Sequence, residues 1–108
     1  MRVLVIRTNG REEIHEIACA LAVSTINRLI GADTFDVVNL RDGRVMLVDE
    51  TGWETRAETR PYGVEIIPVT PRKPINPRAT ALYQSICLPG TTHQIAGDVA
   101  IALDKDFS

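Results

Sequence analysis

Two short segments in the last third of the chain carry side chains suited to binding a ligand. Asn76 and Arg78 flank Pro77, which places an amide beside a planar guanidinium that suits an anion. Pro77 fixes the backbone between them, and this lowers the entropy cost of presenting both groups. The alternative is structural: Asn76 satisfies backbone groups in a loop or caps a helical turn that begins near Arg78.

The second segment offers two hydroxyl groups and an imidazole in a row, from Thr91, Thr92 and His93. Such a loop is able to line a site for an anion or a sugar, or it is simply a tight entry into a strand. Together with Asn76 and Arg78 it predicts a pocket for a small anionic, nucleotide-like ligand. This hypothesis requires that the fold bring the two segments together.

Asp98 lies within the apolar run Ile95–Leu103, where a charge is costly unless it is paired. We expect its partner to be Arg78 or another arginine of the preceding proline-rich segment, which would fasten that segment to the sheet. The alternatives are a ligand, or an outward turn of Asp98 at a bulge formed by Gly97.

A catalytic set does not emerge from the sequence. His15 and His93 belong to no triad pattern, and Ser85 and Cys87 lack the sequence context of a nucleophile. The adjacent pair Asp49-Glu50 is more typical of a turn than of two cooperating carboxylates. We therefore expect a protein that is not an enzyme, with no metal site and no cofactor.

Composition narrows the class of protein further. The chain has 108 residues, which is the size of one domain, and its 44% hydrophobic content predicts a folded core. A formal net charge of −2 argues against a dedicated nucleic-acid-binding protein. There is no apolar run of about 20 residues to span a membrane, and the N-terminal apolar stretch is too short for a signal peptide. We expect a cytoplasmic protein, and homo-oligomerisation is compatible with its small size.

The first half of the chain predicts hairpins and one helix. Val3–Ile6 is a buried strand, Asn9-Gly10 indicates a type I′ turn, and Glu12–Ile17 returns as a second strand. A rival interpretation makes one long helix of Glu12–Ile30. We prefer the hairpin, with a shorter amphipathic helix over Ala20–Ile30 that ends at a glycine cap.

The rest of the chain adds a second hairpin and a final strand. Phe35–Leu40 and Arg44–Val48 pair through a primed turn at Asp42-Gly43. Thr80–Ile86 forms one or two helical turns, and Ile95–Leu103 is a strand in the centre of the sheet. The fold class is therefore α+β: a mostly antiparallel sheet of about five strands with one main amphipathic helix on one face.

Residues 53–77 contain five of the six prolines, and we expect a long, irregular, arginine-rich loop within a single domain spanning 1–108. Val64–Ile67 is at most a short edge strand of this loop. Trp53, Tyr62 and Arg72 are candidate contacts for a partner protein. The alternative function is therefore a protein-interaction inhibitor of a host factor.

The order of several motifs resembles a family of small domain-of-unknown-function proteins found on phages and plasmids. The motifs are Phe35-Asp36-Val37-Val38, Asp49-Glu50-Thr51-Gly52, Pro74–Ala79 and Ile95–Val99, and the resemblance covers nearly the whole chain. The stretch 56–72 is a departure, because many of those proteins lack or shorten it. The resemblance assigns no chemistry and implies only an accessory protein of a mobile element, of a sort that often interferes with host defence.

Overall fold

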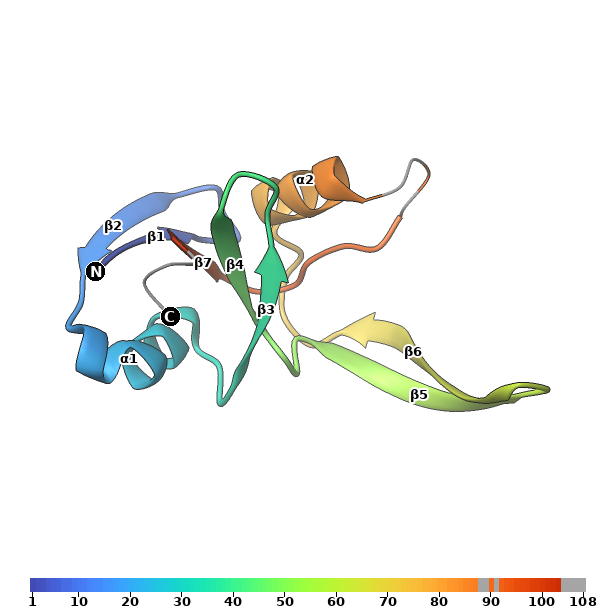
Figure 1. Cartoon of the computed structure of the whole chain (residues 1–108). Helices are drawn as coiled ribbons and strands as arrows, with labels where there is room; N and C mark the ends of the chain where they lie inside the picture. Colours follow the sequence, from blue (N-terminus) through green and yellow to red (C-terminus); the bar gives the residue numbers. More distant parts are fainter. Residues whose placement is uncertain (88–89, 91, 104–108) are drawn as a thin grey trace.

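An antiparallel five-stranded sheet forms the centre of the computed structural model, which describes residues 1–87, 90 and 92–103 (Figure 1). The strand order is β2-β1-β7-β4-β3, and every neighbouring pair is antiparallel. This confirms the predicted α+β class. The strands of this sheet are β1 Arg2–Ile6, β2 Glu12–Glu16, β3 Phe35–Asn39, β4 Arg44–Asp49 and β7 Val99–Leu103.

The last strand is central, as the sequence predicts. Strand β7 pairs with β1 on one side and β4 on the other, and its first four residues are buried. It begins at Val99 rather than Ile95, because the chain makes an isolated bridge from Ala96 to Ile75 and then bends at Gly97, whose φ is +87°. A residue with a side chain is strained in that left-handed region.

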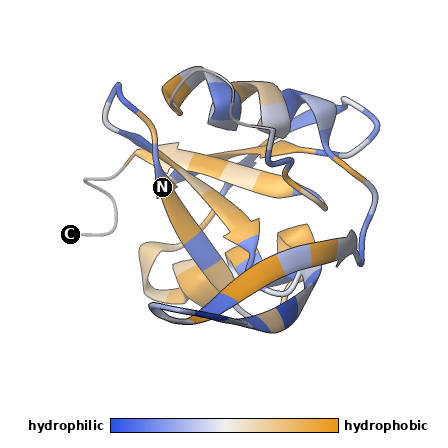
Figure 2. Cartoon of the chain, turned by 90° about the vertical axis from the view of Figure 1, so that its right-hand side faces the viewer, coloured by the Kyte–Doolittle hydropathy of each residue, from blue (hydrophilic) through white to orange (hydrophobic). Residues whose placement is uncertain are grey.

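Two helices cover the two faces of the sheet, where the sequence predicts one main helix. Helix α1 spans Ala22–Ile30 after a short 3₁₀ turn, η1, at Cys19–Leu21, and helix α2 spans Pro77–Ile86. Figure 2 shows apolar strands between the two helical layers. Because both faces are covered, the inner strands are apolar at successive positions and do not alternate with polar residues.

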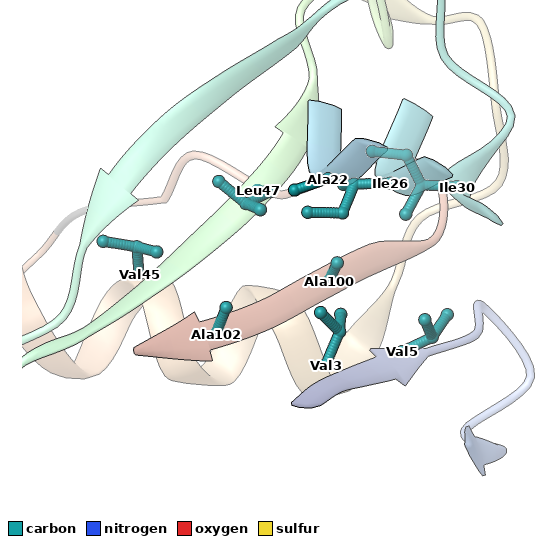
Figure 3. Close-up of a cluster of buried hydrophobic side chains, with 9 residues drawn as sticks. All are labelled: Val3, Val5, Ala22, Ile26, Ile30, Val45, Leu47, Ala100 and Ala102. Carbon is teal, nitrogen blue, oxygen red and sulfur yellow. The ribbon is translucent and has the colours of Figure 1, made fainter. Parts of the chain in front are cut away.

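Each helix packs on its own cluster of buried side chains. The cluster below α1 is drawn in Figure 3 and consists of Val3, Val5, Ala22, Ile26, Ile30, Val45, Leu47, Ala100 and Ala102. The cluster below α2 consists of Ile6, Leu40, Met46, Ala79, Ile95, Val99 and Ile101. The alternation of β1, β4 and β7 residues between the two clusters follows from the two-residue period of a strand.

Helix α1 ends as its sequence predicts. Gly31 has a φ of +70° and donates its N–H to the carbonyl of Arg28 at 3.3 Å. The N–H of Ala32 donates to the carbonyl of Asn27 at 2.8 Å. These two bonds form a Schellman motif, which uses glycine because a left-handed residue must follow the helix.

Both hairpins of the main sheet form, but the predicted turn type is wrong. Strand β2 pairs with β1, which excludes the rival long helix. The N–H of Arg7 donates to Arg11 at 2.8 Å and the N–H of Leu40 donates to Arg44 at 2.9 Å, so each loop encloses three residues. In each loop the glycine, Gly10 or Gly43, is the one residue with a positive φ, whereas a type I′ turn requires two such residues.

The segment predicted as an irregular loop at 53–77 is mostly a two-stranded hairpin. Strand β5, Trp53–Arg60, pairs with strand β6, Gly63–Pro71, and the pair projects away from the main sheet (Figure 1). We call residues 53–71 the arm. Its prolines do not break it, because Pro61 lies in the tip turn and Pro68 and Pro71 lie on a strand with one free edge.

Within the described part of the chain, none of the helices has the length and the apolar composition needed to cross a membrane.

Candidate functional site

Asn76 is a structural residue that joins three parts of the fold. Its side chain is fully buried, and its Oδ1 accepts the N–H of Ala79 at 3.1 Å, which caps helix α2. Its Nδ2 donates to the carbonyl of Ile6 at 2.9 Å and to that of Gly97 at 3.1 Å. The Asn76 amide thus has its hydrogen-bond partners within the protein. Asn76 caps a helix and satisfies backbone groups, which is the structural role given above as the alternative to ligand binding.

Arg78 lies close to Asn76 in sequence but faces different surroundings. Its exposed guanidinium forms an ion pair with Glu12, at the start of β2. Exposed pairs of this kind contribute at most about 1 kcal/mol, and the Arg78 side chain is 54% exposed, so its charge stays in contact with water. Neither Arg78 nor Asn76 lines any of four of the main hollows in the described residues.

Asp98 is paired, as predicted, but with a different arginine. Its Oδ2 lies 2.9 Å from Nη1 of Arg7, and its Oδ1 accepts the N–H of Thr8 at 2.9 Å. The prediction that Arg78 or a proline-segment arginine fills this role is wrong. The left-handed Gly97 turns the chain just before β7, and this places the Asp98 carboxylate beside the loop between β1 and β2.

Arg7 is the centre of a polar cluster that was not predicted from the sequence. It also donates to both carboxylate oxygens of Glu13, at 2.9 and 3.2 Å, and to the carbonyl of Leu29 at 2.6 Å. The hydrogen bond from Arg7, with a further one from His15, lowers the pKa of Glu13 to about 2. The hydrogen bond to Glu13 in turn raises the pKa of Arg7, which outweighs the opposing effect of burial. The cluster holds its charges in mutual pairs and fixes α1 to the β1–β2 hairpin.

A second cation holds the end of α1 to the base of the arm. Lys73 donates to the carbonyl of Gly31 at 2.7 Å and forms an ion pair with Asp49, whose side chain is 3% exposed. Burial acts to raise the pKa of Asp49, but hydrogen bonds from Lys73 and Thr51 outweigh it and lower that pKa. A cation at the carboxyl end of a helix is favourable because the helix dipole is negative there.

Three aromatic rings meet where the arm leaves the body. The ring centroid of His93 lies 5.6 Å from that of Trp53 and 5.7 Å from that of Tyr83. Nε1 of Trp53 donates to the carbonyl of Gln94 at 3.0 Å. Trp53 therefore anchors the base of the arm, and its ring is occupied by protein contacts.

The hollow beside these rings does not suit an anion. It has a volume of about 250 Å³, and Trp53 and His93 line it together with the acidic residues Asp36, Asp49 and Glu50. Lys73 pairs with Asp49, but Asp36 and Glu50 add negative charge beside the hollow, which opposes the entry of a phosphate. Thr92 is exposed, and Thr91 lies outside the described residues. The structure thus places the ring of His93 beside that of Trp53. Arg78 pairs instead with Glu12 and does not line this hollow.

The arm has two faces of different character. Residues on one strand alternate between faces, so pairing places six uncharged side chains on one face and the charged ones, with Ile67, on the opposite face. We call the first set the uncharged face, and all six of its residues are exposed: Thr55, Ala57, Thr59, Val64, Ile66 and Pro68. The charged face consists of Arg56, Glu58, Arg60, Glu65 and Ile67.

The charged face is held by ion pairs within the arm. Glu58 pairs with Arg56 and, at 2.8 Å, with Arg60, and Arg60 also reaches Glu65 at 3.0 Å. The hydroxyl of Tyr62, at the tip, donates to Glu65 at 3.0 Å. The backbone N–H of Arg72 donates to the carbonyl of Gly52 at 2.8 Å, which closes the arm at its base. These contacts give the arm a defined shape although it is only two strands wide.

Comparison of the chain with protein-family models, with curated proteins and with solved structures gave no match. The resemblance to small phage and plasmid proteins therefore stays a prediction. Among the described residues there is also no cluster of three or more histidine, cysteine or acidic side chains that would hold a metal ion.

Proposed function

We propose that this chain is a protein-binding module that acts without catalysis, and that the uncharged face of the arm is its recognition surface. The observation that supports this proposal is the exposure of apolar side chains on an arm that touches the body only at its base. Val64 is 68% exposed and Ile66 is 63% exposed. Contiguous exposed apolar residues on a folded protein are typical of an interaction site.

The energetics of a two-stranded ribbon also support a binding surface on the arm. An isolated pair of strands is at best marginally stable in water. The arm separates its charges onto one side, and this leaves the other side available for contact without desolvating any charge. Burial of the uncharged face contributes about 25 cal/mol for each Å² of apolar surface removed from water, and the entropy cost of association offsets part of that gain.

The partner that fits this surface is a protein with a flat, apolar and uncharged strip. For an accessory protein of a phage or plasmid, binding of this kind would block a host factor. The nucleotide-like ligand remains the other candidate, but the acidic residues that line the hollow with His93 and the absence of Arg78 from that lining support it less. Isothermal titration against a panel of nucleotides tests that candidate directly.

Adjacent isoleucines on opposite faces allow a matched test of the protein-binding proposal. A photo-crosslinking amino acid replaces Ile66 on the uncharged face or Ile67 on the charged face, and the full chain is produced in its host cells. We expect position 66 to give an adduct with one other protein and position 67 to give little. Equal yields from both positions, or no adduct with any protein other than this chain, would contradict the proposal.

A further inference from the structure

The arm has two free edges, and only one of them is suited to pairing with another strand. The edge of β6 carries Pro68 and Pro71, which lack an N–H, and a change of register opposite Glu54/Thr55 leaves Val69 without a partner. Strand β5 has no proline anywhere between Trp53 and Arg60. The free edge of β5 thus resembles an open template for a further strand.

The register shows which groups this edge presents. Pro68 lies opposite Thr55, and a proline fits a ladder only where no N–H is required. Hydrogen-bonded and non-hydrogen-bonded pairs alternate along an antiparallel ladder. Thr55, Ala57 and Thr59 therefore direct their N–H and C=O groups away from β6, toward the free edge.

The sequence of β5 is complementary to itself when it is reversed. The stretch Glu54-Thr55-Arg56-Ala57-Glu58-Thr59-Arg60 has opposite charges at equal distances on either side of Ala57. In an antiparallel pair of two β5 strands centred on Ala57, Arg56 lies opposite Glu58 and Glu54 lies opposite Arg60. The two threonines, Thr55 and Thr59, also face one another.

We propose that β5 pairs with β5 of a second copy of this chain around a two-fold axis at Ala57, which creates a four-stranded antiparallel ribbon. The outward groups of Thr55, Ala57 and Thr59 form its hydrogen-bonded pairs. The opposite charges then occupy the non-hydrogen-bonded positions, where facing Cα atoms are only about 4.5 Å apart and side chains are closest.

The charges also fix the register. An axis moved by one residue, to Arg56 or to Glu58, sets that residue against its own copy and places further like charges opposite each other. Opposed like charges are unfavourable across a ladder. Only the axis at Ala57 pairs every charge between Glu54 and Arg60 with its opposite.

This dimer uses the edge of the arm and not its uncharged face, so it goes beyond the proposed function and does not depend on it. Pairing removes an exposed edge, which proteins otherwise protect from uncontrolled association. It also places the two uncharged faces on the same side of one ribbon, because opposite residues in a ladder point to the same face. Figure 1 shows the arm projecting away from the five-stranded sheet.

The test exchanges charges at two positions and measures mass by sedimentation equilibrium of the full chain. We expect the unaltered chain to be a dimer and Arg56→Glu or Glu58→Arg alone to be monomeric, because each sets like charges opposite one another twice. An equimolar mixture of the two variants restores every opposite pair, and we expect it to form a dimer again. Recovery on mixing separates strand pairing from damage to the fold.

A second variant blocks the hydrogen bonds and leaves the charges in place. Ala57→Pro removes an N–H that β6 does not use, so we expect the arm to remain and the dimer to dissociate. Glu65→Gln, on β6, is the matched control and is expected to leave the dimer intact. The proposal is overturned if the unaltered chain is monomeric at its highest soluble concentration, or if the mixture stays monomeric. Dissociation by Ile66→Lys with no effect of Ala57→Pro would instead assign the contact to the uncharged face.

Discussion

The ammonium group of Lys73 donates to the carbonyl oxygen of Gly31 at 2.7 Å, across 42 positions of the sequence. The same ammonium pairs with Asp49, at the end of β4. One side chain therefore connects the end of α1, the main sheet and the segment that returns from the arm. Together with the hydrogen bond from Trp53 to Gln94, this connection fixes the base of the arm.

Removal of the Lys73 ammonium should destabilise the fold. Lys73→Met leaves the Asp49 carboxylate, which is 3% exposed, with Thr51 as its one remaining partner among the described residues. A buried polar group without its partner costs roughly 1–3 kcal/mol, and we expect a loss of about 2 kcal/mol in the free energy of unfolding. Urea denaturation measures it. The double variant Lys73→Met/Asp49→Asn should recover part of the loss, and equal losses in both variants would contradict the pairing.

Substitution of Asn76 should also affect stability rather than ligand affinity. Asn76→Ala removes the cap of α2 and leaves the carbonyls of Ile6 and Gly97 without a donor, so we expect a loss of about 3 kcal/mol. Asn76→Ser is the matched control, because its hydroxyl restores the cap alone and should recover about 1 kcal/mol. A thermal unfolding series distinguishes these outcomes from a binding residue, whose removal would leave stability unchanged.

The contrast between Asn76 and Asp98 shows what the sequence reveals. The Asn-Pro pattern before a helical period is local, so the capping alternative was available from the sequence alone. Arg7 and Asp98 are 91 positions apart, and several arginines were equally plausible partners. The sequence correctly predicted that Asp98 needs a cation, but the choice of Arg7 depends on how β1 and β7 align.

The arm was missed for a related reason. The alternation of Trp53, Thr55, Ala57 and Thr59 with charged residues has the period of a strand, yet five prolines between residues 61 and 77 favoured an irregular loop. Prolines exclude a strand only when both of its edges are paired. Since β6 has a single neighbour, its prolines are tolerated, and sequence alone does not say how many neighbours a strand will have.

Replacement of the arm should leave the body folded. Glu54 lies opposite Thr70, so an Asn-Gly turn in place of residues 55–69 closes the chain without strain. No side chain of that segment belongs to either buried cluster, and we expect the free energy of unfolding to change by less than about 1 kcal/mol. Chemical denaturation of both forms checks this, and cooperative loss of the whole fold would show that the arm is part of the core.

Acid should weaken the Arg7 cluster within a defined range of pH. The pKa of Glu13 is lowered from an ordinary 4.5 to about 2, so its pairing stabilises the fold fully above pH 4.5. That contribution is lost as pH falls from about 4.5 to about 2, because over this range the Glu13 carboxylate takes up a proton in the unfolded state but stays ionised in the folded state. Glu13→Gln cannot titrate, and its stability should fall less steeply over this range. The urea midpoint of each protein is measured as a function of pH. If the midpoints of the unaltered chain and of Glu13→Gln fall equally steeply, the loss of stability in acid does not arise from Glu13.

Substitution of two glycines that have nearly the same φ should distinguish the cost of backbone strain from the cost of a steric clash. Gly10 and Gly97 have φ values of +88° and +87°, but a Cβ at Gly10 meets nothing within 4 Å, whereas one at Gly97 lies 2.9 Å from Cδ of Lys73. Gly10→Ala should therefore lose only the cost of a left-handed residue, about 1–2 kcal/mol. Gly97→Ala should lose more, since Lys73 is held by Asp49 and Gly31 and cannot move aside freely. In a Lys73→Ala background this excess should disappear, and if it persists in thermal unfolding, the extra cost arises from the backbone and not from Lys73.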